Sequence, residues 1–119
     1  MGKTLIFPCG VPAARRYAEA ARQRGETVIA ASSLAYDESA AQFEKWVFLP
    51  SVYEKDFAAR LNAVVREHDI DRIFAPVSAA HWGIGKLVAE GIVGIELIGE
   101  MPVRQHAREH AALMEQAGE

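Results

Sequence analysis

The amino-acid sequence predicts an α/β fold, a doubly wound sheet of about five mainly parallel strands with helices on both faces. Two patterns indicate it. Short apolar segments of strand length alternate with longer segments of helical periodicity along the chain. The segment at 27–31 is almost continuously apolar, which is typical of a parallel strand buried on both faces. Because 119 residues, half of them apolar, support one hydrophobic core, we expect one folded unit.

The N-terminal part of the sequence is predicted to form strand, turn, helix and strand. Residues 4–7 are a short β-prone run, and the cluster at 8–12, with two prolines and a glycine, ends it. Pro12 suits the first position of a helix because its missing N–H would have no intrahelical partner there. An alanine- and arginine-rich stretch runs to Gly25, a residue type that often ends helices, and the strand at 27–31 follows.

The middle of the chain is predicted to contain a short helix, a strand and a long helix. The short helix lies around 37–43 and the strand at 46–49. Ser51 and Glu54 have the spacing of a capping box, in which each side chain accepts a backbone N–H at a helix start. The apolar residues that follow at helical spacing, up to His68, are Phe57, Leu61, Val64 and Val65. We therefore expect the long helix to begin beside Ser51.

The C-terminal part continues the alternation of strands and helices. Residues 70–75 read as a buried strand, and the helix at 79–90 has one apolar face formed by Ile84, Leu87 and Val88. A last strand at 94–98 precedes a helix at 102–117, whose inward residues would be Val103, Ala107, Ala111 and Met114. This order implies right-handed crossovers and therefore a parallel sheet.

Ligands of such sheets bind beyond the carboxyl ends of the strands. That edge would be lined by residues 8–12, 32–34 and 76–81. The loop at 9–15 places one glycine before a helix N-terminus, whose N–H groups and dipole can bind an anion. The loop lacks the G-x-G-x-x-G pattern, and the second strand ends in two serines rather than an acidic residue. Binding of NAD or FAD is disfavoured, and a purely structural turn is the favoured interpretation of the loop.

Composition excludes several classes of partner. A net charge of −3 with 24% charged residues shows no basic stripe, so nucleic acid is not an expected partner. No apolar run approaches the ~20 residues needed to cross a bilayer, and residues 1–4 do not begin a signal peptide, so we expect no membrane contact and a cytoplasmic location. A single cysteine, Cys9, forms no internal disulfide, which fits a reducing compartment.

Three further patterns are explained more simply by structure. The run at 83–86 (GIGK) lacks two residues of the Walker A pattern, so its glycines are expected to let a helix pack closely on the sheet. His106 and His110 belong to an H-x-x-E-H pattern that zinc hydrolases use, but a charged stretch on a terminal helix is usually a solvated face. Cys9 lies beside a helix N-terminus with no histidine near in sequence, which favours a packed thiol over a nucleophile.

The order and spacing of these elements resemble the domain that precedes the ATP-grasp fold in biotin carboxylase, carbamoyl-phosphate synthase large subunits and related carboxylate–amine ligases. The resemblance covers nearly the whole chain. The segments that carry it are 10–15 (GVPAAR), 43–50 (FEKWVFLP), 69–76 (DIDRIFAP), 94–102 (GIELIGEMP) and 113–118 (LMEQAG).

The resemblance implies a pre-ATP-grasp, Rossmann-like domain at 1–102 and a helix at 103–119 leading toward an ATP-grasp region that is absent here. In the parent reaction, ATP and magnesium convert a carboxylate to an acyl phosphate, which an amine attacks. Most ATP and metal ligands lie in the downstream lobes, so the chain would bind no cofactor alone and would not be catalytic in isolation. The Asp-Lys pair of many family members falls on His106 and Ala107, a departure from the nucleotide-contacting pattern.

The resemblance also implies a substrate-side role, with the downstream lobes and a small-molecule carboxylate as partners and a homodimer as a further possible assembly. No catalytic residue or metal ligand is assigned. The substrate-binding residues would be Gly10, Val11, Pro12, Arg15, Pro76, Ser78 and His81. An exposed apolar patch is expected near the C-terminal helix, where other lobes would pack. The alternative is an autonomous small-ligand or nucleotide-binding regulatory module of flavodoxin-like shape, and a third reading is a small zinc hydrolase.

Overall fold

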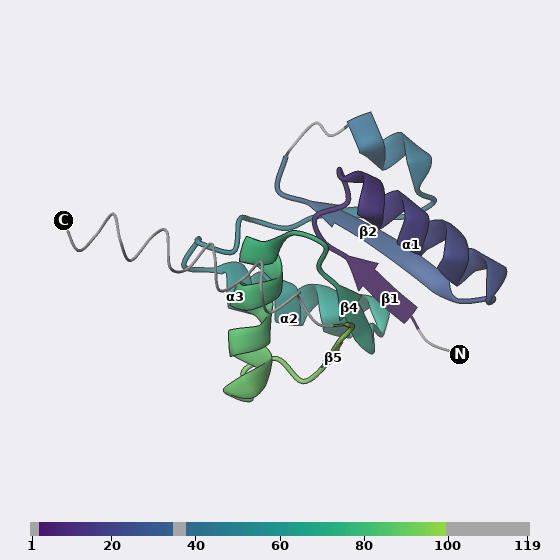
Figure 1. The fold of residues 1–119 in the computed structure, drawn as a ribbon. Coiled ribbons are helices and arrows are strands. Elements are labelled where there is room, and N and C mark those ends of the chain that lie inside the picture. Colours follow the sequence, from purple (N-terminus) through teal and green to yellow (C-terminus); the bar gives the residue numbers. More distant parts are fainter. Residues whose placement is uncertain (1–2, 35–37, 100–119) are drawn as a thin grey trace.

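A computed structural model describes residues 3–34 and 38–99 of the chain (Figure 1). Its sheet has five strands in the order β3-β2-β1-β4-β5, and every neighbouring pair is parallel. Leu5 of the central strand pairs with Ile29 on one side and Ile73 on the other. The strands are β1 (Lys3–Ile6), β2 (Thr27–Ser32), β3 (Trp46–Phe48), β4 (Arg72–Phe74) and β5 (Glu96–Leu97). The predicted doubly wound parallel sheet is confirmed.

Helices cover both faces of this sheet. They are α1 (Pro12–Gln23), the 3-10 helix η1 (Glu38–Gln42), α2 (Phe57–His68) and α3 (Ser78–Ala89). Side chains alternate along β1, so that Leu5 belongs to the core beneath α2 and α3 while Ile6 belongs to the core beneath α1. None of the described helices is long and apolar enough to cross a membrane.

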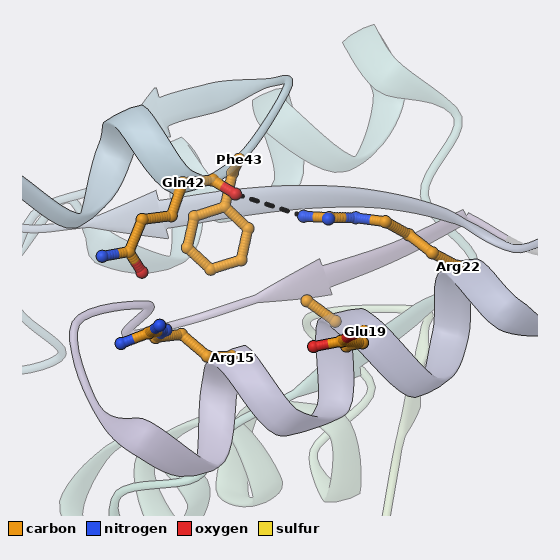
Figure 2. Close-up of a pocket in the computed structure, with 6 residues that line it drawn as sticks. Arg15, Glu19, Arg22, Gln42 and Phe43 are labelled. Atoms are coloured by element: carbon orange, nitrogen blue, oxygen red, sulfur yellow. Dashed lines mark hydrogen bonds between the residues drawn. The ribbon is translucent and has the colours of Figure 1, made fainter.

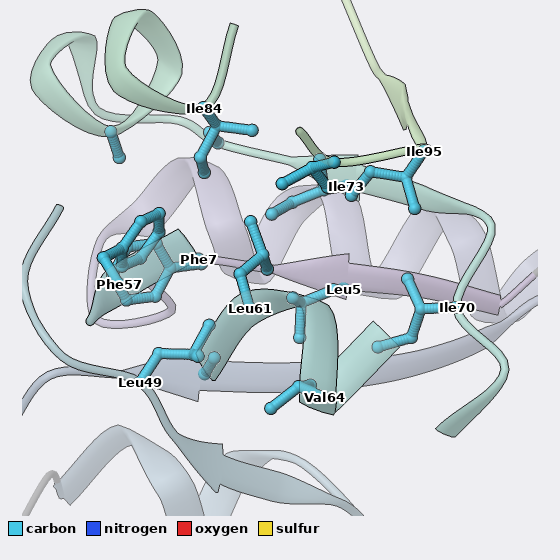
Figure 3. Close-up of a cluster of buried hydrophobic side chains, with 14 of the residues drawn as sticks. Leu5, Phe7, Leu49, Phe57, Leu61, Val64, Ile70, Ile73, Ile84 and Ile95 are labelled. Atoms are coloured by element: carbon cyan, nitrogen blue, oxygen red, sulfur yellow. The ribbon is translucent and has the colours of Figure 1, made fainter. Parts of the chain in front are cut away.

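The larger core lies between the sheet and the helices α2 and α3 (Figure 3). It includes the predicted face of the long helix, with Phe57 and Leu61 almost completely buried. The rings of Phe7 and Phe57 lie 5.6 Å apart between centroids. Ile84 of α3 completes this packing, as its position in the helical pattern predicted.

The smaller core is built from small side chains of α1. Ala14, Ala18 and Ala21 are buried against the sheet, which lets the helix approach it closely. Tyr17 stacks on Phe74 of β4 with ring centroids 4.3 Å apart. The helix ends before Gly25, which has a φ of +80°, as the sequence predicted.

The predicted start of the long helix is wrong. The helix begins at Phe57 with Asp56 as its N-cap, and residues 51–56 form turns. The hydroxyl of Ser51 accepts the N–H of Tyr53 at 3.3 Å, and the Ser51 carbonyl accepts the N–H of Glu54 at 3.0 Å. Local turn bonding therefore takes the place of the capping box, because Ser side chains readily bond nearby backbone groups outside helices.

The last predicted elements are only partly described. Strand β5 is two residues long, shorter than the predicted strand at 94–98. The predicted helix at 102–117 lies outside the described residues, and so do His106 and His110, the candidate zinc ligands. The domain boundary predicted at residues 102 and 103 also falls there.

Candidate functional site

The strand order places a switch point between β1 and β4. From β1 the chain proceeds outward to β2 and β3, and it then returns through α2 to β4 on the other side. The loops that follow β1 and β4 therefore leave the same sheet edge in opposite directions. The N–H of Phe7 donates to the carbonyl of Phe74 at 3.0 Å, and the N–H of Cys9 donates to Ala31 at 3.0 Å. These bonds hold the first loop against both neighbouring strands.

Two helix N-termini meet at this edge. Helix α1 starts at Pro12 and α3 at Ser78, and their N-cap residues, Val11 and Val77, make no side-chain capping bond. A valine side chain has no atom that could accept an N–H. First-turn N–H groups and two helix dipoles are thus directed at the region beyond the switch point, an arrangement that attracts an anion.

Six of the seven predicted site residues lie along this edge, in the two neighbouring loops or the helix starts. Gly10 and Pro12 are exposed, and Val11, Pro76, Ser78 and His81 are half-buried. The N–H of His81 donates to the Val77 carbonyl at 2.9 Å, so this residue closes the first turn of α3.

Arg15, the seventh residue, lines a hollow beside Pro12 and also a pocket between α1 and the end of η1 (Figure 2). The pocket has a volume of about 160 Å³. Its lining residues are Arg15, Ala18, Glu19, Arg22, Gln42 and Phe43. Ala18 and Phe43 are buried and form an apolar floor, and the guanidinium of Arg22 donates to the Gln42 carbonyl at 3.2 Å. Sequence reasoning missed this pocket because nothing local in the sequence pairs α1 with residue 42.

A groove of about 460 Å³ separates α3 from the loop and first turn of α2. Tyr53 at its rim is 82% exposed and Trp82 is 52% exposed, so the groove carries two large accessible aromatic side chains. The backbone of α3 comes close to the loop at Gly83, where an added Cβ would lie 3.3 Å from Val52. The apolar patch expected near the C-terminal helix stays a prediction, because that helix lies outside the described residues.

The opposite, amino edge of the sheet carries a cluster of charged groups. Glu26, 15% exposed at its side chain, pairs with Arg24 at 3.0 Å and also with Arg72. The hydrogen bond from Arg72, and then that from Arg24, hold the pKa of the Glu26 carboxyl below its ordinary value. Asp71 accepts the backbone N–H of Lys3 at 3.0 Å. All these groups have partners within the protein, so we interpret the cluster as structural.

The remaining candidates are consistent with structural roles. The side chain of Cys9 is completely buried, as expected for a packed thiol. Gly85 lies near Leu97 of β5, where an added Cβ would be 3.4 Å from the leucine side chain, an ordinary contact, so the packing of α3 on the sheet does not require glycine at this position. Within residues 3–34 and 38–99, no group of three or more His, Cys, Asp or Glu side chains could hold a metal ion.

Two solved structures of larger proteins share the fold of this chain. Glycinamide-RNase-transformylase T from Mycobacterium tuberculosis aligns with a TM-score of 0.60 at 21% identity, over 81% of this chain and 28% of that one. The fold is Rossmann-like. The dTDP-glucose 4,6-dehydratase RfbB from Bacillus anthracis str. Ames, solved in complex with NAD, aligns with a TM-score of 0.56 at 15% identity, over 82% of this chain and 36% of that one.

These similarities concern the Rossmann-like fold alone, and the chain spans 28% of the length of the transformylase and 36% of that of the dehydratase. No family model matches the sequence, and no curated protein matches it either.

Proposed function

We propose that this chain is the N-terminal, substrate-side lobe of an ATP-dependent carboxylate–amine ligase of the ATP-grasp kind, similar to carbamoyl-phosphate synthase. The observation that carries the proposal is the pair of uncapped helix N-termini, at Pro12 and Ser78, on the two sides of the switch point. They give the lobe an anion-attracting edge suited to a small carboxylate. By this proposal the lobe binds substrate but does not catalyse a reaction alone.

The likeness to the transformylase supports a lobe related to ATP-grasp enzymes. Because this chain corresponds to 28% of that protein, the proposal assigns the remaining functions to partner lobes. The described residues do not offer a cluster that fits magnesium, so we assign no step involving ATP or the metal to this chain.

The alternative function is an autonomous nucleotide-binding module. Its support is the likeness to a dehydratase solved in complex with NAD. The first loop, however, has only Gly10 where the dinucleotide pattern has three glycines, and β2 ends at Ser32, with Ser33 rather than an acidic residue after it. Ser32 is buried, and its hydroxyl accepts the N–H of Leu34 at 3.1 Å. The carboxylate proposal is therefore favoured.

Backbone-amide NMR titration of the chain separates these functions. Sodium acetate should shift the amides of Gly10, Ala13 and residues 78–80 saturably, whereas ATP and NAD should not bind at this edge at submillimolar concentration. Submillimolar binding of either nucleotide at this edge would favour the regulatory module instead. Absence of any saturable acetate shift there would contradict the ligase-lobe proposal.

A substitution that supplies a capping carboxylate sharpens the test. Val77→Asp places an N-cap acceptor at the start of α3, so it should occupy the N–H groups that acetate needs and weaken binding about tenfold or more. Ala63→Asp adds the same charge at an exposed position of α2 and is the matched control. Equal loss of binding in both variants would mean that net charge, not the helix start, governs the effect.

A further inference from the structure

The pocket between α1 and η1 concentrates opposite charges on one helix face. Arg15, Glu19 and Arg22 follow one another at spacings of four and three residues, so they share a face of α1. Figure 2 shows these side chains on α1 opposite the Gln42–Phe43 segment, and the buried Ala18 and Phe43 complete the lining of the pocket. The pocket therefore offers two guanidinium groups and one carboxylate above an apolar floor.

These charges are not neutralised by one another. Among the ion pairs of residues 3–34 and 38–99, none involves Arg15, Glu19 or Arg22. Arg22 donates one hydrogen bond to a backbone carbonyl, which holds it in place and leaves most of its five N–H donors available. Glu26 is the next acidic residue after Glu19 along the chain, and its carboxylate pairs with Arg24 and Arg72.

The size and charge of the pocket together select a ligand class. A volume of about 160 Å³ is smaller than the roughly 300–1,000 Å³ of sites for drug-sized ligands, so the pocket suits a small molecule. A simple anion would leave the Glu19 carboxylate facing like charge, and a simple cation would face two arginines. A small zwitterion satisfies all three side chains.

We propose that this pocket binds a small α-amino acid, with its carboxylate held by Arg15 and Arg22 and its ammonium group by Glu19. Arginine suits the first role because its planar guanidinium matches a carboxylate with two parallel hydrogen bonds. All three charged side chains are exposed, so water screens the contacts, and we expect millimolar affinity that weakens as salt is added. The site extends along α1 from Arg15, one turn after Pro12, and it does not depend on the proposed ligase role.

Titration of the chain with glycine, observed through backbone amides, tests the proposal. Glycine should shift amides at 15–22 and 42–43 saturably, and it should bind more tightly than sodium acetate or methylammonium chloride at the same ionic strength. The amides of Gly10 and 78–80 report acetate binding at the carboxyl edge, which tests the ligase-lobe proposal. The ligase-lobe proposal and the amino-acid proposal can therefore fail separately. Equal affinity for glycine and acetate at this pocket, or no saturable shift there, would overturn the amino-acid site.

Charge-neutral variants identify the partners of each end of the ligand. Arg15→Gln and Arg22→Gln should each weaken glycine binding about two- to fivefold, because each removes a charged hydrogen bond that water screens. Glu19→Gln should weaken glycine but preserve or strengthen acetate, the signature of an ammonium partner. Arg16→Gln changes the same charge at the next residue of α1, outside the pocket lining, and should leave glycine binding unchanged. If Arg16→Gln weakens glycine binding as much as Arg15→Gln does, the effect comes from the overall positive charge of the helix rather than from a specific contact, and the proposal is wrong.

Discussion

Arg72 of β4 forms an ion pair with Glu26, the residue that precedes β2, and so joins two strands that do not touch each other. Strand β1 lies between them and pairs with both. Arg24 binds the same carboxylate at 3.0 Å, so Glu26 connects the end of α1, the start of β2 and β4. The amino edge of the sheet is thereby fixed, while the carboxyl edge carries the two uncapped helix starts.

Glu26→Gln should lower the free energy of unfolding at pH 7 by about 1 kcal/mol, because a partly buried carboxylate with two arginine partners is lost. Urea unfolding followed by circular dichroism measures this change. Arg60→Gln is the control: its pair with Asp56, at 3.6 Å, is more than half exposed on both sides, and its loss should cost less than about 0.5 kcal/mol. Equal effects of the two substitutions would contradict a stabilising role for the Glu26 cluster.

The same carboxylate makes stability depend on pH in the acid range. Arg72 and then Arg24 lower the pKa of Glu26 in the folded protein, so the folded state favours the ionised form. The resulting stabilisation is fully present above the unfolded pKa of about 4.3 and is lost as pH falls through the lower folded pKa. Glu26→Gln should therefore reduce the loss of stability between pH 5 and pH 2, measured as urea midpoints. An unchanged acid dependence would contradict the assigned pKa shift.

Local patterns predicted the sheet and the buried faces because the apolar residues within each segment indicate which of its faces is buried. The apolar strand around Ile29 lies inside a parallel sheet, and Leu61 lies on the buried face of its helix, both as predicted. The Arg72–Glu26 pair joins residues 46 positions apart, so no local pattern could indicate it. Ser51 misled the prediction because its hydroxyl suits a turn as well as a helix cap, and only tertiary packing decides between them.

The common edge of the predicted site residues follows from the same local patterns, whereas their role in binding stays a prediction. Gly10 and Ser78 follow neighbouring parallel strands, and alternation of strands and helices was enough to predict that their loops share an edge. Arg15 was assigned to that edge by resemblance, and its side chain lines a hollow beside Pro12 as well as the α1–η1 pocket, which was not predicted. Which way a helical side chain faces depends on the neighbour of that helix, here the segment ending at Phe43, and the sequence did not indicate this neighbour.

Ala14→Leu should destabilise the protein by about 1–3 kcal/mol, because the side chain is completely buried where α1 meets the sheet and extra atoms would force the two apart. Ala63→Leu makes the same change at an exposed position of α2 and should stay within about 0.5 kcal/mol of the unsubstituted chain. Thermal and urea unfolding give both values. Similar stabilities of the two variants would mean that α1 packs less closely than the structure shows.

The two glycines of α3 should respond differently to alanine, although both lie inside the same helix. Replacing glycine by alanine in a helix interior gains up to about 1 kcal/mol from propensity. At Gly85 the added Cβ would meet Leu97 at 3.4 Å, an ordinary contact, so Gly85→Ala should stabilise the protein by about 0.5–1 kcal/mol. At Gly83 the new atom would lie 3.3 Å from the Cβ of Val52, so part of that gain should be lost to strain.

A double-mutant cycle isolates the contribution of this strain. In a Val52→Gly background the opposing Cβ is gone, and Gly83→Ala should then gain more stability than it does in the unsubstituted chain. Gly85→Ala in the same background is the control and should gain the same amount as before, since Leu97 rather than Val52 is its neighbour. If the two glycines respond alike in both backgrounds, the loop before α2 does not press on Gly83, and the wall of the α2–α3 groove at that point is looser than its geometry indicates.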